Sequence, residues 1–327
     1  MGSELTQSEK LIARVLFVNR LLRANGENFQ FLFSAVMRAK HGTDFVAIQP
    51  QGGKGDGGND GFLPDSGHYF QVYGPVDPES RIAYAKGKLA TDFAKTKANW
   101  TQTSKIERYF FAFNDKYLGT FPDIVKSLET LGKKENIKCR PFTAADLESV
   151  FMELPAARID DVLGQPLPDP NQQIRVDYSV LREVIDHIML APARSITTRF
   201  GELPSIDEKV ELNNLCEAWR DIIRNGARHS EHVDLYYKKN SVFAKQALKD
   251  HLVAAYERCR NEGRGLAKLP DGVSVEDIVF GSFFEALLPA NANVSMQNAV
   301  EIIIGKFFEA CDIFDPYAEK GAPSASP

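Results

Sequence analysis

The chain has 327 residues, enough for two domains, and its 43% hydrophobic and 25% charged residues are typical of a protein with a buried core. Its formal net charge of −5 gives it no overall attraction to nucleic acid. Four widely separated cysteines without a Cys-x-x-Cys pair argue against a zinc ribbon or a disulfide framework.

The first half of the chain alternates predicted helices and strands. Thr6 and Glu9 have the spacing of a capping box and predict the start of a helix, which a second helix with an apolar stripe follows. Strands are predicted at residues 44–50 and 69–75, on either side of the glycine-rich turn GDGGNDG at 55–61. Next we predict a lysine-rich helix (81–100), a strand (107–115), a helix (121–134), a strand (136–142) and a helix (143–154) opened by Thr143 as N-cap. Strands separated by helices indicate crossovers and a mixed α/β sheet.

The second half of the chain has a helical period almost throughout. It begins after residues 163–173, where three prolines in a polar run predict a linker. Helices are predicted at 178–190, 205–229, 242–262, 275–288 and 296–314. We therefore predict an α/β domain at 1–162, an all-α domain at 174–318 and a disordered tail at 319–327.

A basic segment lies within the acidic chain. Residues 81–140 hold thirteen Lys or Arg and six Asp or Glu, a balance of 13 − 6 = +7. Such a segment can form a positive face for a phosphate backbone. A solvated lysine-rich helix explains the same composition.

The glycine-rich turn and the strand after it combine residue types that suit phosphodiester hydrolysis. This reaction needs a metal ion that polarises the phosphate and lowers the pKa of the attacking water. Mg²⁺ prefers carboxylate and carbonyl oxygens, which an acidic residue at one strand and an acceptor on its neighbour can supply. A lysine two residues further along faces the same side, because strand side chains alternate. By itself, a turn of this composition is also compatible with an ordinary hairpin loop.

With this turn, the strand YFQVY and the order of elements, residues 25–155 resemble the PD-(D/E)XK nuclease superfamily, particularly its Mrr-like restriction endonuclease branch. That branch has a GDxGxD turn followed by a strand with Q-x-K. The resemblance implies a restriction-endonuclease-like mixed sheet flanked by helices. It also implies cleavage of DNA, with RNA not excluded, by an enzyme that uses Mg²⁺ or Mn²⁺.

The resemblance also implies roles for individual residues. Asp60 matches the second aspartate of the turn, a metal ligand, and Gln71 matches the glutamine of Q-x-K, with the backbone carbonyl of Val72 as a further ligand. The acid of the first helix in the family pattern falls on Gln30. Glu27, three residues earlier on a similar helix face, is the preferred ligand because it can carry a charge.

Tyr73 departs from the family pattern, because it stands where the lysine of Q-x-K is expected. Lys54 before the turn, or Lys86 or Lys88 on the following helix, could replace that lysine, and Lys86 is included in the predicted catalytic set with Asp60, Gln71 and Glu27. Alternatively, the site binds nucleic acid or a partner without cutting. The predicted nucleic-acid contacts are Lys54, Lys86, Lys88, Lys95 and Lys97.

The stretch RFGELPSIDEKVELNNL, at residues 199–215, resembles C-terminal modules of bacterial ABC-three-component defence systems. We therefore expect the helical domain to serve oligomerisation, partner docking or sensing. The N-terminus lacks the pattern of a signal peptide, and no apolar run approaches the ~20 residues of a membrane span, so we expect a cytoplasmic protein outside the membrane. The predicted function is an effector nuclease of an anti-phage or restriction-type system; the alternative is a degenerate nuclease fold that acts as a binding subunit.

Overall fold

The chain divides into two compact units. The computed structural model describes residues 4–49, 56–193, 206–239, 242–266 and 268–309. Unit 1 comprises Phe17–Leu163, and unit 2 comprises Leu5–Leu16 together with the described residues from Gly164 onward. Residues 5–16 thus group with unit 2, whereas the sequence placed them in the N-terminal domain. The predicted tail at 319–327 lies outside the described residues.

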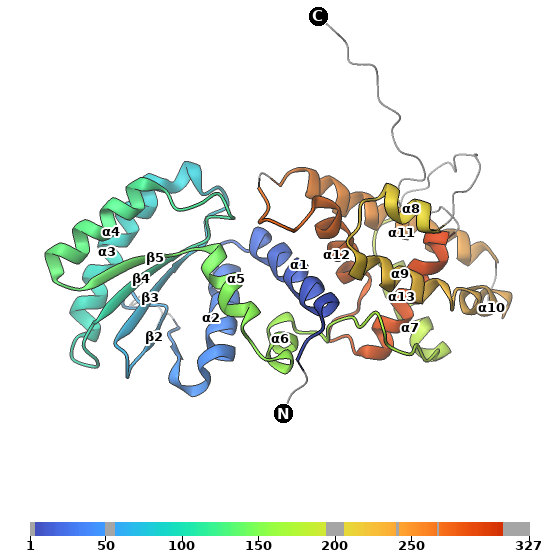
Figure 1. Cartoon of the computed structure of the whole chain (residues 1–327), viewed down its shortest axis with the longest axis horizontal. Coiled ribbons are helices and arrows are strands. Elements are labelled where there is room, and N and C mark those ends of the chain that lie inside the picture. Colours follow the sequence, from blue (N-terminus) through green and yellow to red (C-terminus); the bar gives the residue numbers. More distant parts are fainter. Residues whose placement is uncertain (1–3, 50–55, 194–205, 240–241, 267, 310–327) are drawn as a thin grey trace, which may run out of the picture. The chain divides into compact units, whose positions relative to one another are not determined.

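Unit 1 contains a mixed sheet of five strands in the order β1-β2-β3-β4-β5 (Figure 1). The first three strands pair antiparallel, and β3, β4 and β5 pair parallel. The bounds are β1 (Val46–Ala47), β2 (Gly61–Leu63), β3 (His68–Tyr73), β4 (Arg108–Phe113) and β5 (Lys138–Phe142). The mixed sheet predicted from the alternation of elements is confirmed. The short strand β2, directly after the glycine-rich turn, was not predicted.

Helices cover both faces of this sheet (Figure 1). The helices of unit 1 are α2 (Glu27–His41), α3 (Ile82–Trp100), α4 (Pro122–Glu135), α5 (Ala144–Met152), α6 (Ala156–Leu163) and the last residues of α1 (Gln7–Arg23), with the 3-10 helices η1 (Gly42–Asp44) and η3 (Glu79–Arg81). On one face, Phe33 of α2 packs on Phe70 and Phe142, with ring centroids 5.5 and 5.7 Å away. Thr143 forms the predicted N-cap of α5, as part of a capping box with Asp146.

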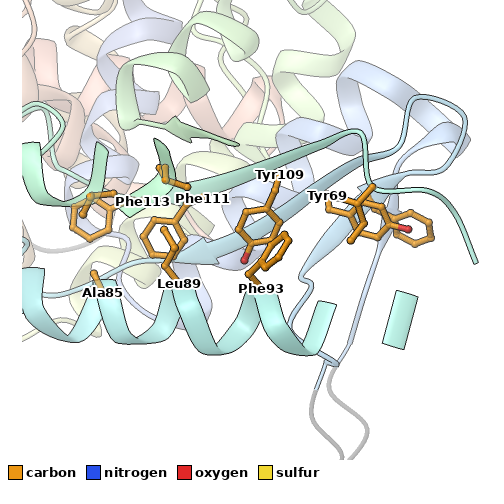
Figure 2. Close-up of a cluster of buried hydrophobic side chains, with 11 residues drawn as sticks. Tyr69, Ala85, Leu89, Phe93, Tyr109, Phe111 and Phe113 are labelled. Atoms are coloured by element: carbon orange, nitrogen blue, oxygen red, sulfur yellow. The ribbon is translucent and has the colours of Figure 1, made fainter. Parts of the chain in front are cut away.

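The opposite face of the sheet packs against α3 and α4. Figure 2 shows side chains of α3 at four-residue spacing directed at alternate residues of β4. Ala85, Leu89 and Phe93 of α3 share this buried cluster with Tyr109, Phe111 and Phe113 of β4. Because strand side chains alternate, the odd-numbered residues of β3 face the same side. Helix α3 is thereby fixed over the face that carries Tyr69, Gln71 and Tyr73.

The described part of unit 2 is helical, as predicted, with a core that contains Trp219, Phe280 and Phe284. Its helices are α7 (Tyr178–Met189), α8 (Ile206–Leu212), α9 (Glu217–Ala227), α10 (Glu231–Lys239), α11 (Val242–Arg264), α12 (Val275–Leu287) and α13 (Val294–Glu309), with the first residues of α1. The single helix predicted at 205–229 is interrupted between α8 and α9, where Asn214 has a left-handed φ of 47° that asparagine tolerates. Among the described residues, no helix has both the length and the apolar character of a membrane span.

Two glycines let α9 and α13 approach until their backbones touch. A Cβ added at Gly305 of α13 would overlap the backbone of Gly226 and Ala227 in α9. A Cβ added at Gly226 would in turn overlap the carbonyl oxygen of Glu301. The packing of unit 2 therefore depends on the absence of a side chain at this crossing.

Replacing Gly305 with alanine is expected to force the two helices apart and to lower the free energy of unfolding by roughly 1–3 kcal/mol, the usual cost of overpacking. Thermal unfolding followed by circular dichroism measures the effect. Gly87→Ala is the control, because Gly87 lies inside α3 with nothing within 4 Å of an added Cβ. That change should be neutral or stabilise by up to about 1 kcal/mol. Equal unfolding temperatures for Gly305→Ala and wild type would contradict the expectation.

Candidate active site

Asp60 and Gln71 meet at the junction of the glycine-rich turn and the sheet. The register that pairs Gly61 with Phe70 places Asp60 directly opposite Gln71 on the neighbouring strand. Both side chains are buried, with 4% and 1% of their surface exposed. Asp60 Oδ2 accepts hydrogen bonds from Gln71 Nε2 and from the backbone N–H of Val72, each 2.6 Å long. The carboxylate is thus held in one orientation.

The second oxygen of this carboxylate is held by α2. Gln30 Nε2, from the first turns of that helix, donates a hydrogen bond to Asp60 Oδ1. The start of α2 is itself tied to the end of β3, because the Gly26 N–H donates to the carbonyl of Gly74 over 2.6 Å. Gln30, the residue at the position given by the family pattern, therefore reaches Asp60. Glu27 lies one turn earlier and is exposed, so its role as a ligand stays a prediction.

The turn that carries Asp60 is docked on α3 through glycine. Gly57 and Gly58 have φ values of 69° and 83°, a region that favours glycine. A Cβ at Gly58 would overlap the backbone carbonyl of Asp92 in α3. Thr96 Oγ1 donates a 2.5 Å hydrogen bond to the Gly58 carbonyl, and the Gly58 N–H donates to Asp56 Oδ1 over 2.7 Å. The turn and the helix are therefore held in direct backbone contact.

A buried acid on α3, Asp92, was missed by the sequence analysis. It is 6% exposed, and its carboxylate pairs with Lys88 Nζ at 2.5 Å and with Lys95 Nζ at 3.5 Å. A signal was available in the sequence: Asp92 lies seven residues after Ala85, on the apolar stripe of an otherwise lysine-rich helix. An acidic residue at an apolar position of a helix indicates a buried and paired carboxylate.

Burial raises the pKa of Asp60 from its ordinary value of 3.8 to about 7. The charges of Asp56 and Asp92 contribute to this increase, while the Val72 hydrogen bond and the charge of Lys88 oppose it. Burial acts to lower the pKa of Lys88, but its hydrogen bond to Asp92 and the nearby carboxylates outweigh burial, so the pKa is raised. Lys88 is therefore a cation that acts on Asp60 near neutral pH.

The oxygen atoms around Asp60 suit a hard cation. Within the described ranges, no three or more His, Cys, Asp and Glu side chains are grouped so that they could hold a metal ion. A metal at Asp60 would therefore need amide or carbonyl oxygens as well, which are ligands that Mg²⁺ accepts. Gln71 would meet this need with its amide turned, because Nε2 now faces Asp60, while Oε1 is buried and has no hydrogen-bond donor among the described residues. An unpaired buried acceptor beside a carboxylate fits an oxygen-coordinated cation.

The predicted nucleic-acid-binding lysines are mostly engaged in ion pairs. Lys86 Nζ lies 3.1 Å from Asp123 of α4 rather than at Asp60, and Lys97 Nζ lies 2.6 Å from Glu135. The two lysines between them pair with Asp92, as described above. Lys54 lies outside the described residues. Of the two described candidates for the missing lysine, Lys86 and Lys88, it is Lys88 whose charge acts on the carboxylate.

Tyr73 fills the lysine position of the family pattern with an aromatic ring. Its ring centroid lies 6.4 Å from that of Phe111, 5.9 Å from that of Phe113 and 5.7 Å from that of Tyr84. Burial and the neighbouring Tyr84 raise the pKa of its phenol. The phenol therefore stays neutral, and this position supplies no cation.

A comparison with protein families gives a match in the C-terminal region. Residues 179–315 match the family described as C-terminal domain 10 of the ABC-three component (ABC-3C) systems. The resemblance of this region to modules of those defence systems is thereby confirmed. Neither the comparison with curated proteins nor the comparison with solved structures gives a match. The nuclease resemblance of the N-terminal half stays a prediction.

Replacing Asp60 with asparagine is expected to stabilise the protein at pH 8 in metal-free buffer. The pKa of Asp60 is raised from 3.8 to about 7 on folding. The contribution of the protonated carboxyl to the free energy of unfolding is therefore fully present below about pH 4 and is lost as the pH rises through about 7. The loss is about 1.4 kcal/mol for each pH unit in that interval. Asparagine does not titrate, so the free energy of unfolding of Asp60→Asn should exceed that of wild type by roughly 2–4 kcal/mol at pH 8.

Urea unfolding at several pH values measures this difference. The control is Asp56→Asn, which keeps the oxygen that accepts from the Gly58 N–H and should leave the pH dependence in place. A stability difference between Asp60→Asn and wild type that is the same at about pH 4 and at pH 8 would contradict the burial argument.

Proposed function

We propose that unit 1 is a metal-dependent nuclease that hydrolyses DNA, and that the chain is the effector of a defence system of the ABC-three component type. The observation that carries this proposal is the buried Asp60 carboxylate, held opposite Gln71 at the end of a glycine-rich turn. A buried carboxylate beside an unpaired amide oxygen is costly for stability alone. The arrangement is better explained by a ligand that this site binds.

Mg²⁺ or Mn²⁺ fits the oxygen atoms at this position. Asp60, the amide oxygen of Gln71 and the backbone carbonyl of Val72 would hold the ion, with the Gln71 amide turned so that its oxygen faces the carboxylate. When bound, the ion would polarise a phosphate and lower the pKa of an attacking water. Gln30 and the Val72 N–H keep the Asp60 carboxylate oriented. Burial of Asp60 keeps bulk water away from its oxygens.

Lys88 is the cation that we assign to the role of the missing lysine, in place of the predicted Lys86. Its charge acts on Asp60 and Asp56, and its bond to Asp92 holds its ammonium group in place. Helix α3 would thus supply from outside the sheet the charge that Tyr73 cannot supply from β3. A fixed ammonium group stabilises the negative charge that develops on a phosphate during hydrolysis.

The family match of residues 179–315 supports a role in defence. ABC-three component systems combine several proteins, so unit 2 is proposed to dock a partner protein or a second copy of the chain. A nuclease in such a system would act when its partners permit it.

Tyr73 supports a second candidate function, which is non-catalytic binding. With an aromatic ring at the lysine position, the same fold could dock nucleic acid or a partner without cutting it. The two functions differ in what Lys88 does and in whether a metal ion is bound.

The first test compares wild type with Asp60→Asn on plasmid, linear duplex and single-stranded DNA, with Mg²⁺ or Mn²⁺. Wild type should cut at least one substrate, and Asp60→Asn should lose about 100-fold or more of the rate. Metal binding gives a readout without activity: Mn²⁺ should raise the unfolding temperature of wild type and leave that of Asp60→Asn unchanged. Absence of both the cleavage and the metal-induced shift in wild type would contradict the nuclease and favour the binding function.

The second test separates the lysines of α3. Lys88→Met is expected to lower the cleavage rate about 100-fold, as loss of a group that stabilises developing charge does. Lys86→Met should stay near wild type, because Lys86 pairs with Asp123 on α4. Lys95→Met is the matched control, because Lys95 also pairs with Asp92 but is 55% exposed. Loss of activity in Lys86→Met with full activity in Lys88→Met would overturn the assignment.

A further inference from the structure

A row of aromatic rings runs from the core of unit 1, by way of Tyr73 on β3, to the surface at Tyr84. Phe111 and Phe113 are buried, and their rings lie 6.4 and 5.9 Å from the half-buried ring of Tyr73. Tyr73 in turn lies 5.7 Å from Tyr84, with an angle of 39° between the ring planes. Tyr84 ends the row with 60% of its surface exposed.

This exposed ring lies close to the groups that would hold a phosphate. Tyr73 is two residues after Gln71 and faces the same side of the sheet, about 7 Å further along the strand. Tyr84 is four residues before Lys88, so the two side chains are neighbours on one face of α3. The charges of Arg81 and Lys88 both act on the Tyr73 phenol, which places cations around the ring pair.

We infer that Tyr84 is a stacking platform for an unpaired nucleobase, and that the site therefore takes single-stranded or locally unpaired DNA. The inference rests on the proposed function. A base of single-stranded nucleic acid offers a free face to an aromatic ring, whereas the bases of a duplex are covered by their neighbours. An aromatic ring beside cations, next to the place of the scissile phosphate, is the combination that single strands bind.

The ring contact with Tyr73 distinguishes Tyr84 from an ordinary exposed tyrosine. Single exposed aromatic residues are common and need no explanation. The ring of Tyr84, however, is supported by a second ring that is itself packed on the core, so less conformational freedom is lost when a base stacks on it. Tyr178 in unit 2 is the useful contrast: it is 43% exposed, and its hydroxyl is bonded to His232.

The test measures binding without cleavage, by fluorescence anisotropy of the full chain carrying Asp60→Asn. The probes are a labelled single-stranded DNA of mixed sequence, the same sequence as a duplex, and its RNA copy. The single strand should bind more tightly than the duplex. Adding Tyr84→Ala should weaken single-strand binding about tenfold and leave duplex binding unchanged. Tyr84→Phe, which keeps the ring, should bind like the parent, and so should Tyr178→Ala. The RNA arm shows whether the unpaired base comes from DNA or from RNA.

Tighter binding of the duplex, no binding of any probe, or an equal loss on all probes in Tyr84→Ala would overturn the inference. A loss in Tyr84→Phe as large as in Tyr84→Ala would also overturn it, because the ring would then not be the cause. The proposed function is judged separately, by metal-dependent cleavage in wild type. A wild type that cuts duplex DNA while Tyr84→Ala binds all probes normally would remove the stacking role and keep the nuclease.

Discussion

The pairing of β2 with β3 is the constraint on which the candidate site depends. Strand β2 has only three residues, yet its register decides whether Asp60 faces Gln71, and a slip of one residue would turn it to the other side of the sheet. Glycines hold that register on both sides of Asp60. A Cβ at Gly61 would overlap the ring of Phe45, and one at Gly58 would overlap the Asp92 carbonyl. The glycine-rich turn therefore packs closely against both the sheet and α3, and its glycines make this close packing possible.

The buried position of Asp60 opposite Gln71 destabilises the ionised form of its carboxylate. A buried acid with a pKa of about 7 has lost most of the hydration that favours its charged form, and only a few hydrogen bonds and Lys88 compensate. Groups held against their own stability tend to mark functional sites, because selection for stability alone would replace them. Asp92 differs, since its two lysine partners satisfy it within the protein.

The sequence sufficed for the mixed sheet, which follows from the alternation of elements. The roles of Asp60 and Gln71 were implied by the family resemblance, and the strand β2 that places Asp60 opposite Gln71 was not predicted. The sequence did not suffice for the residues on α3. Lys86 and Lys88 are only two positions apart, but on a helix they point to nearly opposite sides, so the choice depends on how α3 is rotated over the sheet. The apolar stripe that contains Ala85 sets this rotation, and Asp92, four residues after Lys88, marks the buried side. The apolar stripe and Asp92 are both visible in the sequence. The contact of Gln30 with Asp60 is not, because it depends on where α2 begins relative to β3.

The charges around Asp60 determine what the proposed metal ion would have to do for a phosphate to bind. The charge of Lys88 acts on three carboxylates, those of Asp56, Asp60 and Asp92, and Lys95 pairs with Asp92, which gives 2 − 3 = −1 when these five described groups are ionised. A phosphate is repelled by that balance, and a proton on Asp60 only brings it to zero. A divalent cation held by Asp60, as proposed, would change the balance from −1 to +1 and would replace the proton, since a ligating carboxylate must be deprotonated. With such an ion bound, the loss of the strand lysine at Tyr73 would be tolerable for cleavage, because the ion would supply positive charge at the phosphate. In the proposed nuclease, Lys88 of α3 would take the role of the strand lysine, and Tyr73 would be free to support the ring of Tyr84.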